Sequence, residues 1–144
     1  MKKVADILKR KGSNVTTVSP STTVIDALKI MADQNIGSVM VADENGFRGI
    51  VTERDYSRKV VLKGRSSTET KVEEIMSTDF PKTSPQATIE ECMQLLSEKN
   101  IRYLPVFKDG VVCGIISIND VVKETISAQE ETINSLKDYL HTGI

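Results

Sequence analysis

The sequence predicts a mixed α/β (α+β) fold in which a β-α-β-β-α unit occurs twice, in a pseudo-two-fold arrangement, before a long C-terminal helix. The first reason is an internal repeat: residues 18–60 align without a gap on residues 83–125, at a constant offset of 114 − 49 = 65. Nine of the 43 aligned positions are identical, whereas chance alone would give about two. The second reason is that both copies show the same order of strand-like and helix-like apolar patterns.

Each element is predicted from its apolar spacing and from the turn residues beside it. Val24, Ala27 and Met31 recur at helical spacing, and Thr22 or Thr23 is a suitable N-cap for this helix. An Asn-Gly turn then separates two short apolar runs, as in a β-hairpin. The other elements expected in the first copy are a helix at 4–9, strands at 15–18, 36–42 and 47–51, and a helix at 52–62.

The second copy repeats this order and extends it. We expect a helix at 72–76, a strand near 82–83, a helix at 88–99, strands at 102–107 and 111–116, and a final helix from 118 to about 140. The corresponding division of the chain is a first repeat at 1–62, a polar linker at 63–70, a second repeat at 71–126 and a helical extension at 127–144. A repeat of about 60 residues is marginally stable alone, so the two should form one intertwined module.

Composition excludes several classes of function. The 19 Lys and Arg residues balance 20 Asp and Glu, and the chain has no Trp, so neither a basic footprint nor a stacking platform for nucleic acid is expected. No apolar run is long enough to span a membrane, and residues 1–6 lack the apolar segment of a signal peptide. Cys92 and Cys113 lie in apolar patterns and form no CxxC. These features predict a soluble protein of the reducing cytoplasm.

One polar motif ends both copies. Residues 49–55 and 114–120 share the pattern Gly-Ile-apolar-Ser/Thr-x-x-Asp at a predicted strand-to-helix junction. A helix cap is one interpretation, because Ser or Thr followed by an acid three residues later forms a capping box. A ligand site is the other, because the motif occurs twice, a Gly precedes it, and Asp is shorter than the Glu or Gln that capping boxes prefer. An Asp could accept the hydroxyls of a ribose, and a helix N-terminus could hold a phosphate.

From residue 4 to residue 126 the chain resembles a pair of CBS domains, the cystathionine-β-synthase repeat, which together make a Bateman module. The resemblance rests on GIVTERD and GIISIND, on the N-I-x-x-apolar-x-V strands at 35–41 and 100–106, on a Ser-Pro pair before each long helix, and on the leading segments 4–8 and 72–76. Residues 52–67 and the helical tail further resemble small stand-alone bacterial proteins of this kind.

This resemblance implies an adenosine ligand, such as AMP, ADP, ATP, NAD(H) or S-adenosylmethionine, in the cleft between the repeats. It implies that Asp55 and Asp120 bind ribose hydroxyls, that Thr52 and Ser117 meet phosphate or ribose, and that strand segments line the adenine. Arg102 falls where some members hold a phosphate, whereas Gly37 is its counterpart, so the two sites should be unequal. The full set of expected binding residues is Thr16, Thr17, Val18, Ser38, Val39, Met40, Thr52, Arg54, Asp55, Lys82, Thr83, Arg102, Tyr103, Leu104, Pro105, Ser117, Asn119 and Asp120.

The expected function is therefore a non-catalytic sensor that binds an adenine nucleotide, forms a disk-like homodimer and regulates an unidentified partner protein. The alternative is a structural dimerisation module in which both motifs only cap helices. The chain holds one histidine, His141 in the tail, so no catalytic triad or metal site is expected. Two questions stay open: whether the basic cluster around Arg54 and Arg65 reaches a phosphate or only faces solvent, and whether the apolar stripe of the last helix packs on its own domain or forms a dimer contact.

Overall fold

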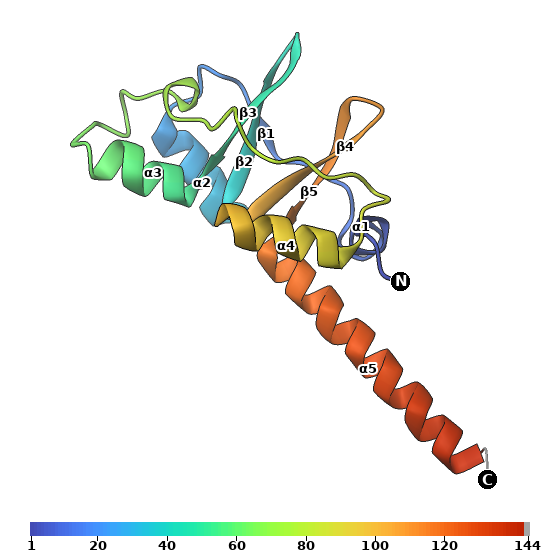
Figure 1. Ribbon diagram of the computed structural model, residues 1–144. Coiled ribbons are helices and arrows are strands. Elements are labelled where there is room, and N and C mark those ends of the chain that lie inside the picture. Colours follow the sequence, from blue (N-terminus) through green and yellow to red (C-terminus); the bar gives the residue numbers. More distant parts are fainter. Residues whose placement is uncertain (143–144) are drawn as a thin grey trace. The chain divides into compact units, whose positions relative to one another are not determined.

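The computed structural model describes residues 1–142, which fold into two compact units (Figure 1). One unit consists of residues 15–80, and the other combines residues 1–14 with residues 81–142. Each unit therefore holds the strands and the long helix of one repeat together with one of the two leading segments: residues 72–76 belong to the first unit and residues 4–8 to the second. The mixed α/β fold with a long C-terminal helix is as predicted.

The unit of residues 15–80 is a three-stranded sheet with helices beside it. The central strand β2 pairs in parallel with β1 and antiparallel with β3. Helix α2 connects the first two strands, and Thr23 rather than Thr22 caps it by accepting a hydrogen bond from the Asp26 backbone N–H. The elements are β1 (Thr17–Val18), α2 (Val24–Gln34), β2 (Ser38–Asp43), β3 (Gly46–Thr52), α3 (Glu53–Tyr56), a π-helical turn (Ser57–Val61) and a 3-10 turn (Val72–Glu74).

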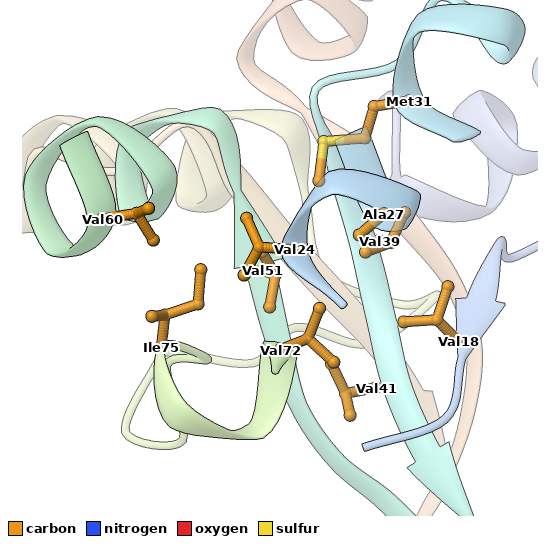
Figure 2. Packing of buried hydrophobic residues seen from close by; sticks show 10 residues of the cluster. All are labelled: Val18, Val24, Ala27, Met31, Val39, Val41, Val51, Val60, Val72 and Ile75. Atoms are coloured by element: carbon orange, nitrogen blue, oxygen red, sulfur yellow. The ribbon is translucent and has the colours of Figure 1, made fainter. Parts of the chain in front are cut away.

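The core of this unit lies on one face of its sheet. Val39 and Val41 alternate with Ser38 and Met40 along β2, so the two valines share one face. Figure 2 shows this face packing against Val24, Ala27 and Met31 of α2. The valines are fully buried in this cluster, and Ser38 and Met40 consequently lie on the opposite face.

The second unit repeats the plan with a hairpin and three helices. Strand β4 (Tyr103–Lys108) pairs antiparallel with β5 (Val111–Ser117). The helices are α1 (Val4–Lys11), α4 (Ile89–Lys99) and α5 (Ile118–Thr142). Helix α1 packs in the core of this unit through Val4 and Ile7, and Figure 1 shows α5 continuing well beyond the strands of its unit.

Both hairpins carry a β-bulge at the same place in the repeat, with Arg48 as the extra residue in β3 and Cys113 as the extra residue in β5. A repeated glycine follows the extra residue on each of these strands. A Cβ on Gly49 would lie 2.8 Å from the Ser77 carbonyl oxygen, and a Cβ on Gly114 would lie 2.8 Å from Leu8 Cδ2. The close approach expected at these glycines is thus made by the chain itself, and it no longer argues for a ligand.

Two predicted elements are wrong in extent. The helix expected at 72–76 is only a 3-10 turn, because the chain then becomes extended and Ser77 exchanges two backbone hydrogen bonds with Ile50. The strand expected near 82–83 is a single bridge between Thr83 and Val106. Pro81 and Pro85 flank that bridge, and because proline has no backbone N–H it cannot extend a ladder.

Candidate functional site

The first copy of the motif lies where β3 meets α3, and its acid is closed in by hydrogen bonds. Asp55 Oδ2 accepts the Thr52 backbone N–H at 2.9 Å and the Thr52 hydroxyl at 3.1 Å. Asp55 Oδ1 lies 3.0 Å from the Lys59 ammonium and accepts the Ser77 hydroxyl at 3.2 Å. Both oxygens therefore carry two partners, and the residue is buried.

The second copy lies where β5 meets α5, and its acid is engaged on one oxygen. Asp120 Oδ2 accepts the Ser117 backbone N–H and the Lys11 ammonium, each at 2.8 Å. Asp120 Oδ1 takes part in neither bond, and this side chain is 17 % exposed against 10 % for Asp55. The second carboxylate thus keeps an oxygen outside these two contacts.

These contacts correct the argument from side-chain length. Asp was expected to be too short for a capping box and to be kept for an outside partner, yet Asp55 and Asp120 both accept the backbone N–H of the residue three positions before them. In return, the hydroxyls of Thr52 and Ser117 accept the backbone N–H of each Asp at 3.1 Å. Both motifs are therefore helix caps, whatever else they do.

The charge of Asp120 is stabilised by its surroundings. Burial alone raises the pKa of its carboxyl, but the hydrogen bonds from Lys11 and from the Ser117 backbone outweigh burial and hold the pKa below its ordinary value of 3.8. The carboxylate is consequently ionised at neutral pH and can accept hydrogen bonds from a polyol.

The strand residues expected beside the first motif divide between the two faces of the sheet. Ser38 pairs with Thr52 across the hairpin, and the Met40 backbone N–H donates a hydrogen bond to the Thr16 carbonyl. Thr17 is exposed and pairs with Met40. Val18 and Val39 have side chains in the core, so their backbone groups alone could meet a ligand.

The same division holds beside the second motif. Tyr103 pairs with Ser117, Pro105 pairs with Ile115, and Leu104 belongs to the core. Thr83 is buried and bonds to the backbone of β4 at Pro105 and Phe107. The Lys82 ammonium lies 4.6 Å above the Phe107 ring, a cation–π contact.

The residue before each middle strand is tied to the motif by the backbone. The Arg102 carbonyl accepts the N–H of Ile118 at 2.8 Å, and the Gly37 carbonyl accepts the N–H of Glu53 at 3.1 Å. Arg102 is exposed, and Asn119 is also exposed one residue beyond Ile118. A basic residue thus adjoins the start of the motif helix through its backbone in the second copy, whereas a glycine occupies this place in the first.

Sequence reasoning missed the cations that pair with the two acids. Lys59 could have been found, because it lies four residues after Asp55 on the same helical stretch. Lys11 carries no such signal, because 109 residues separate it from Asp120 and only the fold joins them. Of the basic cluster in the first repeat, Arg65 pairs with Glu74 rather than standing alone.

Other kinds of site find no support in the described part of the chain. No group of three or more His, Cys, Asp or Glu side chains in residues 1–142 could hold a metal ion. No helix among the described residues has the length and apolar character needed to cross a membrane. Cys92 is buried, Cys113 is half-buried at the bulge of β5, and both are free thiols.

Comparison with known proteins identifies the repeat. The family model for the CBS domain matches residues 4–61 and again residues 72–127. The mitochondrial CBS domain-containing protein CBSX3 of Arabidopsis thaliana is 34 % identical and covers 97 % of this chain and 72 % of its own. The CBS domain-containing protein YhcV of Bacillus subtilis is 30 % identical, with 92 % and 93 % covered.

Solved structures agree with these matches. A protein with CBS domains from Burkholderia ambifaria, described as acting in signal transduction, superposes with a TM-score of 0.85 at 46 % identity, over 89 % of this chain and 96 % of its own. The CBS-domain protein ATU1752 of Agrobacterium tumefaciens gives a TM-score of 0.82 at 34 % identity, over 86 % and 99 %.

Proposed function

Because this chain belongs to the CBS-domain family and carries two CBS repeats in tandem, we propose that it is a non-catalytic regulatory module that binds an adenine nucleotide. The ligand is AMP, ADP, ATP or NAD(H), and its binding alters how a homodimer of the chain acts on a partner protein. The observation that carries this proposal is the repeated junction of strand and helix that presents an Asp beside a Ser or Thr hydroxyl.

The second copy of the motif is the better candidate for the principal site. Asp120 Oδ1 is outside the cap and the Lys11 ion pair, so it can accept a ribose hydroxyl without breaking the helix cap. Arg102 adjoins the same helix start, and a guanidinium suits a phosphate because it offers several N–H donors in one plane. Asp120 would thus bind the ribose and Arg102 the phosphate of one nucleotide.

The first copy is the weaker candidate, because both oxygens of Asp55 already have partners. A ribose at this position would have to displace Ser77 or Lys59, and the displaced group would need new partners. Gly37 also offers no cation where the second copy has Arg102. We therefore propose that nucleotide fills the Asp120 site first.

Regulation then follows from differential affinity. A ligand shifts an equilibrium between two arrangements only by the difference in its affinity for them. Lys11 is the residue that would respond to ligand binding, because it belongs to α1 and pairs with the carboxylate that would hold the ribose. A ribose bound at Oδ1 would share the charge of this carboxylate with Lys11, and so would weaken the Lys11–Asp120 ion pair that joins α1 to α5.

The rival function is a structural dimerisation module without a ligand. The specific observation in its favour is that both motifs form capping boxes in which Asp accepts the backbone N–H. Under this alternative, Asp55 and Asp120 contribute stability, and an added nucleotide has no effect on the parent chain or on its variants.

A thermal-shift screen separates the two functions. We expect AMP, ADP, ATP or NAD(H) to raise the midpoint of unfolding of the parent, because a ligand that binds the folded state stabilises it by mass action. GMP and ribose 5-phosphate at equal concentration are the controls for the base and for the phosphate. If no adenine ligand raises the midpoint above these controls at millimolar concentration, the sensor function is wrong and the structural module stands.

A further inference from the structure

The exposed face of α5 has the spacing of a coiled coil. Val122, Ile126, Gln129, Ile133, Leu136 and Leu140 follow one another at intervals of 4, 3, 4, 3 and 4 residues. This is the a/d pattern of a heptad repeat, with Ile126, Ile133 and Leu140 at a and Val122, Gln129 and Leu136 at d. The apolar members are 40–63 % exposed, whereas a surface helix usually buries such a stripe against the core of its own domain.

The unit to which α5 belongs contacts the opposite side of this helix. Val121 and Glu124 are buried, and Glu124 pairs with Arg10 of α1. Two turns further, Glu131 pairs with Lys2. Glu124 and Glu131 are f positions of the heptad, directly opposite the a/d stripe. The stripe therefore remains available while α5 stays anchored to its own unit.

We propose that the occupant of this stripe is the α5 helix of a second copy of the chain, and that the two helices form a parallel, in-register, two-stranded coiled coil over residues 122–140. Two of the three a positions are Ile and one d position, Leu136, is Leu, and Ile at a with Leu at d favours two strands in parallel. The seam would be about 28 Å long, since an α-helix rises about 1.5 Å per residue. This dimer contact does not depend on nucleotide binding.

The polar residue in the stripe selects the parallel orientation. In a parallel pair, Gln129 faces the partner's Gln129, so the two amides can hydrogen-bond to each other inside the seam. In the antiparallel pair that keeps all apolar layers matched, Gln129 faces the partner's Ile133 and its amide loses water without gaining a hydrogen bond. A single polar residue at a core position commonly sets register in this way.

The charged flanking positions favour the same orientation. The e positions are Lys123, Glu130 and Lys137, and the g positions are Thr125, Thr132 and Tyr139. A parallel pair places e beside g of the partner, so no like charges meet. The antiparallel pair places e beside e, which brings Lys123 near the partner's Lys137 and Glu130 near the partner's Glu130.

The groove between α4 and α5 borders the proposed seam. It is lined on the α4 side by Met93 and by the carboxylates of Glu90 and Glu98. The groove borders the g side of α5 at Thr125, which is the side that receives the partner's e positions. Helix α5 begins beside the end of α4, since Ile118 bonds to Arg102. In the parallel pair the partner's Glu130 lies beside Thr125, so the orientation rests on Gln129 and on the e and g positions rather than on this groove.

Sedimentation velocity of the full chain tests the contact. The parent should sediment as a dimer, and Ile133→Glu should raise the dimer dissociation constant at least about 100-fold, because each copy would bury a charge in the seam. Asn134→Glu is the matched control, because it adds the same charge one residue away, off the stripe, and should leave the dimer intact. A monomeric parent, or a dimer whose dissociation constant is changed by neither substitution, would overturn the proposal.

Cysteine crosslinking tests the orientation. Gln129→Cys should form an interchain disulfide under mild oxidation in the parallel dimer, while the parent, with its native Cys92 and Cys113, should not. Gln129→Cys mixed with Ile133→Cys should yield mainly the two homodimers rather than the mixed species. A predominant 129–133 crosslink would contradict the parallel seam. Circular dichroism of each variant checks that α5 stays helical.

Discussion

The repeated glycines give the sharpest stability prediction, because the two copies differ in what lies above them. In Gly49→Ala, the new Cβ would lie 2.8 Å from the Ser77 carbonyl oxygen and 2.9 Å from Met76 Sδ. Ordinary contacts begin at 3.4 Å, so backbone must move. Ser77 cannot move freely, because it exchanges hydrogen bonds of 2.9 and 3.0 Å with Ile50.

The expected cost follows from two opposing terms. Overpacking of this kind costs about 1–3 kcal/mol, while replacing Gly by Ala stabilises by about 0.4–1 kcal/mol through the unfolded chain. The net loss for Gly49→Ala is about 1–2 kcal/mol. In Gly114→Ala the nearest atom is the end of the Leu8 side chain, which can rotate away, so the two terms should cancel to within about 0.5 kcal/mol.

Urea unfolding followed by far-ultraviolet circular dichroism measures this difference, since the chain has no Trp for fluorescence. Equal slopes of the unfolding curves are the control for an unchanged unfolded state. Gly49→Ala should unfold at clearly lower urea than the parent, and Gly114→Ala at nearly the same urea. A Gly49→Ala variant as stable as the parent would refute the packing of Met76 and Ser77 over β3, and a Gly114→Ala variant as unstable as Gly49→Ala would refute the freedom of the Leu8 side chain to rotate away.

Three further predictions concern the caps and their ion pairs. Thr88→Ala should cost about 1 kcal/mol in urea unfolding, because the Thr88 hydroxyl caps α4 by accepting the Glu91 N–H; an unchanged midpoint would contradict the cap. Asp55→Ala should cost about 2 kcal/mol or more, since it removes four contacts and leaves Lys59 without its acid, and Lys59→Met in the same background should recover part of the loss. The pKa of Asp120 is lowered in the folded state, so this carboxylate adds stability above its unfolded pKa, and that stability is lost as pH falls through its folded pKa. Asp120→Asn should therefore lose less stability than the parent between neutral pH and pH 3. An equal loss in parent and variant would contradict the Lys11–Asp120 pair.

Much of the fold could be predicted from the sequence, because the repeat supplies each element twice. The alignment of Asn35 with Asn100 and of Gly49 with Gly114 placed the strands and helices in the right order. Both asparagines end a helix in the left-handed conformation, at φ 53° and 52°, which explains why the same residue stands at both positions. Local signals of this kind can be predicted from sequence because they depend on only a few neighbouring residues.

The parts that could not be predicted depend on long-range packing. Residues 72–76 do not form the predicted helix because Ser77 pairs with Ile50, and no local sequence pattern predicts this pairing. The pairing of Lys11 with Asp120 arises only because α1 packs beside β5. The motif Asp residues reach the backbone N–H groups of Thr52 and Ser117, although Asp is shorter than Glu, because that reach depends on backbone geometry as well as on side-chain length.

The most direct test of the nucleotide-sensor account is isothermal titration of AMP and ATP into the parent, Asp120→Asn and Asp55→Asn. Asparagine keeps a similar shape at each cap, so the comparison isolates the carboxylate that receives the ribose. The account predicts that binding to the parent is weakened at least about 10-fold by Asp120→Asn, as one lost charge-assisted hydrogen bond implies, and much less by Asp55→Asn. Nucleotide binding that is unchanged in Asp120→Asn, or absent from the parent, would contradict it.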